Sequence, residues 1–361
     1  MILFFLFLLF FQVQPRPSLL QRGLVALKNG QLTEARHDLE GASQTDPKNP
    51  YVWSSLAQTY LRLKLPEQAS AAAQKAEKTG SNNPLVCHAL AMFYSETGQL
   101  QRAAEFEQKF AESPQADGEA SARAIQLYLS AGETQQASKL AQRAWEANKT
   151  NEQMAFAYAQ ILLRGEDFTQ AADVLGSALS AHAQDPQLTL ALGVARYGQR
   201  RFDDAIATFL KVIQLDPSVE QPYLFLGRVL EQAGDRLPEI TKAYESWAAR
   251  EPQNAKAQLL LAEALLAQDH RSERARDLLQ KSIALDGKDW ESHYQLGVAL
   301  ANQRNWQEAS AELNRSIELN PKQPLPHYHL ARVYDRLGQS ERAEEDRKIH
   351  QQLTASQKPE H

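Results

Sequence analysis

The chain has 361 residues and carries 44 acidic against 39 basic side chains, a formal net charge of −5 at pH 7. A nucleic-acid partner would require a face rich in lysine and arginine, so this balance predicts no nucleic-acid binding. Cys87 is the single cysteine, which excludes an intrachain disulfide.

Residues 1–14 (MILFFLFLLFFQVQ) differ in composition from the rest of the chain. Their apolar run ends at Phe11; it is too short for a membrane span of about 20 residues but has the length typical of secretory signals. No basic residue precedes the run, and Gln14-Pro15-Arg16-Pro17 follows it in place of a small-residue cleavage site. We predict that the protein is exported (periplasmic or secreted) or anchored to a membrane through this segment. The alternative is a buried capping strand or helix.

Beyond this segment, alanines recur at a fixed interval of 34 residues. The spacing slips by two residues after Ala205 and then resumes, so that the full set is Ala35, Ala69, Ala103, Ala137, Ala171, Ala205, Ala275, Ala309 and Ala343. A fixed period of this length is typical of arrays of helical repeats.

One period, residues 186–217, predicts two short helices. Leu192 and Gly193 lie on the first, Ala205 and Phe209 lie on the second, and Pro217 follows its end. This pattern resembles the tetratricopeptide repeat family. Other repeats carry it too: Trp53, Leu56, Ala57, Tyr60, Ala69 and Ala73 in the second, and Leu296, Gly297, Leu300, Ala309, Leu313 and Pro321 in the ninth.

The resemblance covers about residues 16 to 350 and implies an all-α fold. We expect an α-solenoid, a superhelical stack of about ten helix-turn-helix hairpins over residues 16–353, followed by a disordered tail over residues 354–361. Two irregularities account for the slip in spacing. Glu239 stands where alanine is due and Ile240 restores the pattern one residue later, while a second insertion lies around residues 269–272. Both should lengthen turns between helices.

In the family, the first helix of each repeat lines the concave wall, and its second, fifth, ninth, twelfth and thirteenth places face the groove. The groove residues that this implies here are Gln58, Met92, Gln126, Phe156, Gln160, Leu190, Tyr197, Leu224, Arg228, Tyr294, Tyr328 and Arg332. Such a mixture suits an extended or helical peptide, because apolar side chains supply binding energy and amides hydrogen-bond a backbone. Alternatively Leu190, Val194 and Leu224 pack within or between repeats, whereas Tyr294, Tyr328 and Arg332 should be accessible.

One subtype of the family is disfavoured. Its chaperone-binding members hold a partner's C-terminal carboxylate with a lysine at the fifth place and an asparagine at the ninth. The corresponding pairs here include Ser54 with Gln58 and Leu190 with Val194. We therefore predict that this carboxylate clamp is absent.

The sequence predicts no catalytic residue, no metal site and no cofactor. It contains no glycine-rich phosphate loop, zinc-type cysteine pair or nucleophile elbow. His327 and His329 are two residues apart, so on a helix they point to different sides and make a poor metal pair. The charge run Glu344, Glu345 and Asp346 predicts a solvated helix face.

Three hypotheses of function remain. The first is a non-enzymatic scaffold that binds a protein or peptide partner in its concave groove. The alternative is an accessory subunit of a glycosyltransferase or of a polysaccharide or protein export assembly, since similar arrays occur in both. A third is direct carbohydrate binding by groove tyrosines, for which the candidates are Tyr51, Tyr197, Tyr294 and Tyr328.

Overall fold

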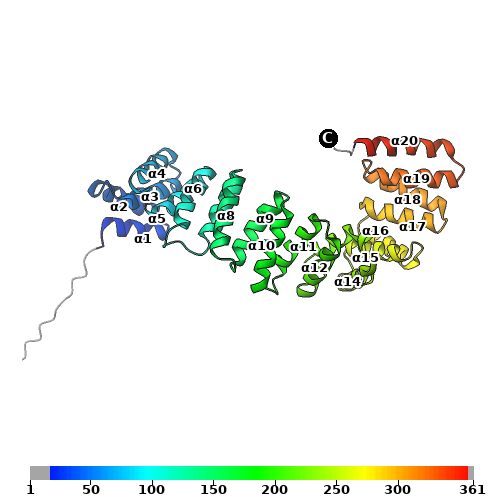
Figure 1. Ribbon diagram of the computed structural model, residues 1–361. Helices are drawn as coiled ribbons and strands as arrows, with labels where there is room; N and C mark the ends of the chain where they lie inside the picture. Colours follow the sequence, from blue (N-terminus) through cyan, green and yellow to red (C-terminus); the bar gives the residue numbers. More distant parts are fainter. Residues whose placement is uncertain (1–16, 357–361) are drawn as a thin grey trace, which may run out of the picture. The chain divides into compact units, whose positions relative to one another are not determined.

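The computed structural model describes residues 17–356, which form 20 α-helices and two 3-10 turns and contain no strand (Figure 1). The predicted all-α class is therefore confirmed. The signal-like segment, residues 1–14, lies outside the described residues. The chain divides into two compact units, residues 1–162 and 163–361, and the boundary falls within the ninth helix.

The helices alternate as the first and second helices of the ten predicted repeats. Unit 1 contains α1 (Leu19–Lys28), α2 (Leu32–Thr45), α3 (Pro50–Arg62), α4 (Pro66–Gly80), α5 (Pro84–Glu96), α6 (Leu100–Ala111), α7 (Ala120–Ser130), α8 (Thr134–Ala147) and most of α9 (Glu152–Arg164).

Unit 2 continues the same alternation. It contains α10 (Phe168–Ala181), α11 (Pro186–Gly198), α12 (Phe202–Leu215), α13 (Gln221–Arg228), the 3-10 turns η1 (Leu230–Gln232) and η2 (Gly234–Arg236), α14 (Leu237–Arg250), α15 (Ala255–Gln268), α16 (Glu273–Leu285), α17 (Trp290–Asn302), α18 (Trp306–Leu319), α19 (Pro324–Arg336) and α20 (Ser340–Ser356).

Most first helices begin at a side chain that caps free backbone N–H groups. Ser18 caps α1 in a reciprocal pair with Gln21. Asn83 accepts from the Val86 N–H at 3.2 Å, and Asp185 accepts from the Leu188 N–H at 2.7 Å. Helices α7, α13 and α19 begin without such a side-chain cap, so the sequence marks the start of most first helices but not of all.

The repeated alanines lie where the two helices of a hairpin meet. All nine are buried; Ala35, Ala205 and Ala309, for example, are 0% exposed. Glycine at the facing place of the first helix serves the same close approach. A Cβ added to Gly297 would lie 2.6 Å from Leu313 Cγ, closer than real atoms pack. The period in the sequence is thus a period of close helix–helix contacts.

Repeat seven is the main irregularity, and the sequence predicted its position. Ile240 is fully buried at the place of the missing alanine, and Glu239 is exposed. Isoleucine is larger than alanine, so the two helices of this hairpin cannot approach as closely as in the other repeats. Helix α13 is also short, and the 3-10 turns η1 and η2 follow it. Leu230 follows α13 in η1.

A cluster of stacked aromatic side chains fills the hairpin of repeat seven. The rings of Tyr223 and Trp247 stack at 4.5 Å between centroids, and Tyr244 donates to the Tyr223 carbonyl at 2.8 Å. The second predicted insertion is also present: residues 269–272 link α15 to α16, where the equivalent link after α17 comprises residues 303–305.

The end of the array departs from two predictions. Helix α20 continues to Ser356, so residues 354–356 are helical and not part of a tail, because no helix breaker precedes Pro359. Residues 357–361 lie outside the described range. Asp346 is buried, not solvated: it pairs with His327, from the other helix of the hairpin, at 2.6 Å.

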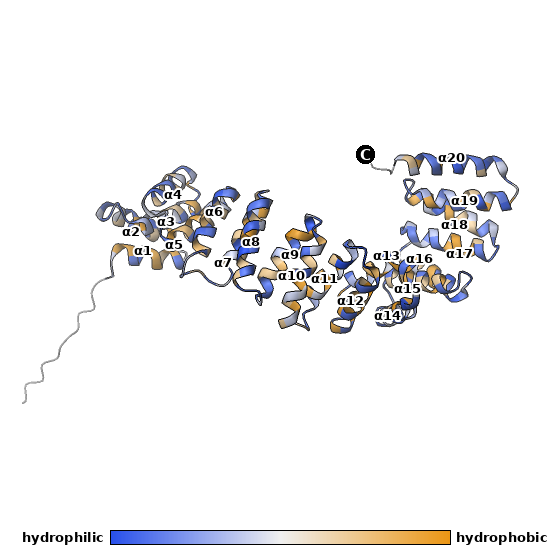
Figure 2. Ribbon diagram, viewed as in Figure 1, coloured by the Kyte–Doolittle hydropathy of each residue, from blue (hydrophilic) through white to orange (hydrophobic). Residues whose placement is uncertain are grey.

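Helix α20 is mostly hydrophilic, whereas α9 to α12 carry broad apolar stretches (Figure 2). A polar last helix keeps the open end of a repeat array soluble. No helix within residues 17–356 combines the length and the apolar character that crossing a membrane would require.

Candidate partner-binding surface

All twelve predicted groove residues lie on first helices. These are α3 (Gln58), α5 (Met92), α7 (Gln126), α9 (Phe156, Gln160), α11 (Leu190, Tyr197), α13 (Leu224, Arg228), α17 (Tyr294) and α19 (Tyr328, Arg332). Within unit 1, α3 contacts both α1 and α5. Within unit 2, α13, α15, α17 and α19 contact one another in succession. Each unit thus carries a row of adjacent first helices.

None of the twelve side chains is fully buried. Met92, Gln126, Arg228, Tyr328 and Arg332 are exposed, and the other seven are half-buried. The surface is therefore one on which a partner could make contacts without the fold rearranging. That these residues do bind a partner stays a prediction.

In unit 1 the row presents amides and a methionine. Gln58 donates through Nε2 to the Ala89 carbonyl of the next first helix at 3.5 Å, so one of its two amide hydrogens is engaged. Met92 is 42% exposed, unusual for so apolar a side chain. Methionine adapts its shape to different partners, which suits a contact surface.

A charged cluster lies under this part of the surface. Glu107 of α6 is 2% exposed and accepts from Arg123 Nε at 2.7 Å, while its other oxygen lies 2.8 Å from His88 Nδ1. The cluster joins α5, α6 and α7. It was not predicted, because its members are distant in the sequence and share no motif.

In unit 2 the aliphatic and aromatic groove residues of repeats six and seven are each partly exposed and partly packed against the core. Leu190, Leu224 and Tyr197 are half-buried and pack against the core of repeats six to eight. The Tyr197 ring also lies 5.9 Å from that of Phe225, which in turn stacks on Phe209 at 5.0 Å. The alternative reading of Leu190 and Leu224 as packing residues therefore applies to part of each side chain.

The last two first helices carry an aromatic group. Tyr294 of α17 and Tyr328 of α19 flank His329, with ring centroids 5.6 and 5.2 Å from it. Tyr328 is 43% exposed and Arg332 is exposed, as predicted, but Tyr294 is only half-exposed. Burial raises the pKa of Tyr294 to about 12, with smaller effects from the Glu263 and Glu231 charges. Burial, and then the Arg332 charge, lowers the pKa of His329 to about 4, so this imidazole is neutral at pH 7.

Two histidines pair with carboxylates inside their hairpins. His327 and His293 each place Nδ1 2.6 Å from a carboxylate, Asp346 and Glu312 respectively, across the hairpin to which they belong. No three histidine, cysteine or acidic side chains within the described residues cluster as metal ligands would.

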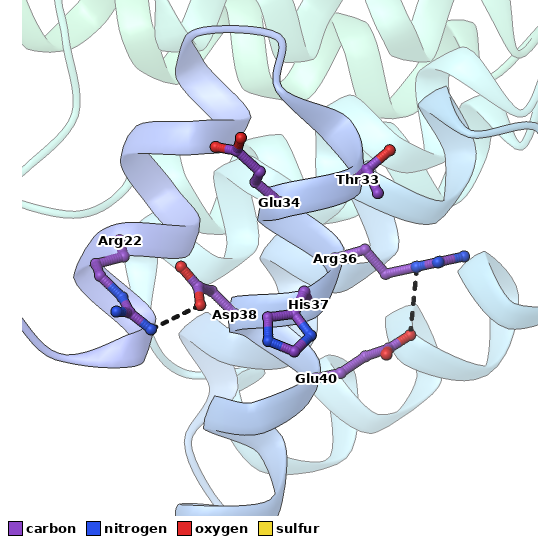
Figure 3. A pocket seen from close by; sticks show the side chains of 7 residues that line it. All are labelled: Arg22, Thr33, Glu34, Arg36, His37, Asp38 and Glu40. Atoms are coloured by element: carbon purple, nitrogen blue, oxygen red, sulfur yellow. Dashed lines mark hydrogen bonds and ion pairs between the residues drawn. The ribbon is translucent and has the colours of Figure 1, made fainter.

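The hollow drawn in Figure 3 lies on repeat one. Six of its lining residues lie on α2 and the seventh, Arg22, on α1; the full set is Arg22, Thr33, Glu34, Arg36, His37, Asp38 and Glu40. Arg22 pairs with Asp38 at 2.8 Å and Arg36 lies 3.9 Å from Glu40, so these charges satisfy one another. The hollow is open to solvent, and all of its lining residues except Arg22 belong to a second helix.

Comparison with solved structures finds a similar helical fold that covers most of the chain. A structure of Naa15/Naa10 bound to HypK-THB matches 93% of this chain and 58% of its own at 16% identity, with a TM-score of 0.50. The match to yeast Tom70 covers 93% of this chain and 91% of Tom70, at 14% identity and a TM-score of 0.42. The match to a crystal structure of MamA covers 46% of this chain and 95% of MamA, at 21% identity and a TM-score of 0.38. At these identities the similarity concerns the fold alone.

Models of sequence families match on both units. All are described as tetratricopeptide repeat, and they cover residues 26–93, 123–187, 156–220, 190–236, 290–323 and 312–345. No curated protein sequence shows a significant match to the chain. The matched residues fall on the alternating helices described above, and the chain belongs to the tetratricopeptide repeat family.

Proposed function

We propose that the protein is a non-enzymatic scaffold that binds a protein or peptide partner along its first helices. The observation that carries the proposal is the composition of this surface. Amides, part-exposed aromatic side chains and arginines that lie over aromatic rings recur on the first helices. None of the twelve predicted groove residues is fully buried. Aromatic and arginine side chains are enriched where partners bind most tightly.

Site-specific photocrosslinking in cells tests the proposal. A photoreactive phenylalanine analogue at Gln126 or Tyr328 should capture a partner, because both side chains are exposed on first helices. The same analogue at Glu105 and Arg315, exposed on second helices, is the matched control. Equal capture from both sets of positions would argue against a binding surface on the first helices.

The identity of the captured protein separates the two readings of this function. A glycosyltransferase or an export component recovered in stoichiometric amount would support an accessory role in such an assembly. Any other protein or peptide partner would support the general scaffold.

The localisation proposal rests on the apolar run of residues 1–14. We expect the protein in an exported or membrane fraction. N-terminal sequencing and cell fractionation measure this, and recovery of the protein in the cytosol with residues 1–14 retained would contradict it.

A further inference from the structure

Two arginines of unit 2 differ from most arginines of the molecule. Arg228 and Arg332 are exposed, and the guanidinium of each lies over an aromatic ring, 5.5 Å from the centroid of Phe225 and 5.6 Å from that of Tyr328. Neither has a carboxylate within ion-pair distance among residues 17–356. By contrast, Arg347 of the last hairpin pairs with both Asp335 and Glu344.

A guanidinium on an aromatic face keeps its N–H edge free for a planar acceptor. The ring also restricts the side chain, so less conformational entropy is lost when an acceptor binds. Arginines held in this way and left without an internal carboxylate are suited to bind a carboxylate from another molecule.

The helices place these arginines on one row. Arg228 is at the end of α13 and Arg332 is on α19, and α15 and α17 connect the two helices by successive contacts. On the intervening helices Glu263 accepts from Gln295 Nε2 at 3.1 Å, and Lys256 is engaged with Glu291 at 2.7 Å.

We propose that the first-helix surface of unit 2 recognises an acidic stretch of an extended peptide, with Arg228 and Arg332 each binding a side-chain carboxylate. This inference rests on the proposed function and names the chemistry of its partner. It differs from the carboxylate clamp, whose residues the chain lacks, because it requires acidic side chains and no free C-terminus.

We expect this recognition to depend on pH through Glu263, which lies on α15 between α13 and α17 in the row of first helices. Burial, and then the charge of Glu291, raises its pKa to about 7. The other ionisable groups that interact with it are Lys256 on its own helix, Asp289 and Tyr294 at α17, and Tyr244 on α14. An anionic guest meets repulsion from ionised Glu263 and none from the neutral form. Binding should therefore take up a proton and tighten as pH falls through about 7.

Fluorescence anisotropy with synthetic peptides tests the proposal. The probes are acetylated, amidated peptides of alternating glutamate and alanine, with lysine and glutamine versions of the same length. We expect the full chain to bind the glutamate peptide more tightly than the other two. Arg228→Ala and Arg332→Ala should each weaken it by about fivefold, and the control Arg271→Ala, also an exposed arginine of unit 2, should not. Tightening below pH 7 should vanish in Glu263→Gln.

Several results would overturn the inference. They are a preference for the lysine or glutamine peptide, an equal effect of Arg271→Ala, or no binding of the glutamate peptide, whose C-terminus is amidated. Retained pH dependence in Glu263→Gln would remove the role of that residue. The scaffold function is tested separately, and it fails if photocrosslinks do not favour first helices. If the crosslinks do lie on first helices but the chain shows no preference for the glutamate peptide, only the inference about partner chemistry is wrong.

Discussion

At the scale of single residues, the turn between the two helices of a repeat is a point of backbone strain. The chain adopts positive φ there at intervals of one period, in Gly30, Gly98, Gly132, Gly234 and Gly338 but also in Lys64, Glu166, Arg200 and Arg304. The left-handed conformation costs a residue with a Cβ roughly 1–2 kcal/mol, and glycine avoids this cost.

Arg304→Gly should therefore stabilise the protein. Arg304 has φ of 67° and an exposed side chain, so glycine relieves strain and loses no buried contact. Against this, glycine gains more freedom in the unfolded chain, and we expect a net increase of about 0.5 kcal/mol in the free energy of unfolding. Urea titration measures it. Gly98→Ala, at φ of 77° with no atom near the added Cβ, is the reverse substitution and should cost about 1 kcal/mol. A loss of stability in Arg304→Gly would show that backbone strain is not what this position contributes.

Glu107 should contribute more to stability than any exposed acid of its helix. Glu107→Gln removes the negative charge that the buried side chain presents to Arg123 and His88, and leaves the Arg123 guanidinium without its buried counter-charge. We expect a loss of about 2 kcal/mol. Hydrogen exchange should then accelerate across α5, α6 and α7, and not in distant repeats, because each repeat contacts only its neighbours. Glu105→Gln, on the exposed side of α6, is the control. Similar exchange in the two variants would contradict a structural role for the cluster.

Whether a side chain is buried could be predicted from the sequence where the period itself carries the information. The nine alanines are buried and the twelve groove residues are not, because a fixed place in a repeat fixes the side of the helix on which a residue lies. Asp346 shows the limit. Its sequence neighbours indicate a solvated charge run, but its position is decided by His327, 19 residues earlier on the facing helix. A local pattern does not contain that contact.

At the scale of helices, α15 presents to α17 a half-buried acid, Glu263, whose ionisation opposes folding. The pKa of Glu263 is about 7, above the value of 4.5 expected in the unfolded chain. The folded state therefore holds the proton more strongly, so the contribution of Glu263 to stability is fully present below pH 4.5 and is lost as pH rises to about 7.

Glu263→Gln should remove this loss. At pH 8 we expect the variant to be more stable than the native chain by about 2 kcal/mol, less than the full shift implies because the side chain is only partly shielded from water. The difference should shrink at pH 5, where native Glu263 is protonated. Urea unfolding at both pH values measures this, with Glu231→Gln, an exposed acid on η1, as the control. Equal stabilisation of Glu263→Gln at pH 5 and pH 8 would mean that ionisation is not the cause.

The boundaries of elements were predictable to the extent that caps mark them. Asn83 and Asp185 begin their helices as a capping residue should. The course of the chain after Arg228 was not predictable. The one-residue insertion was visible in the spacing, yet nothing in the sequence distinguishes a longer turn from the pair of 3-10 turns that follow α13. That choice depends on how Ile240 and Tyr244 pack between neighbouring repeats.

At the scale of the whole molecule, stability is distributed along the chain. An array in which each hairpin packs only on its neighbours has no single core to lose, so its repeats should be interchangeable wherever their contact residues agree. In unit 2, Leu296 and Leu300 of α17 correspond to Leu330 and Tyr334 of α19, and all four are buried.

Removal of one full period should therefore leave a folded protein. Deleting residues 289–322 takes out α17 and α18 and joins Lys288 to Gln323, which restores a turn of the same length before α19. Helix α19 then meets α16 as α17 does now. We expect circular dichroism to show unchanged helicity per residue and a lower midpoint of thermal unfolding, because one interface between hairpins is lost. Deleting residues 289–305 removes half a period and places a second helix where a first helix belongs, so that chain should lose cooperative unfolding in unit 2. If the full-period deletion proves as disruptive as the half-period one, the repeats are not exchangeable units and the additive account of stability is wrong.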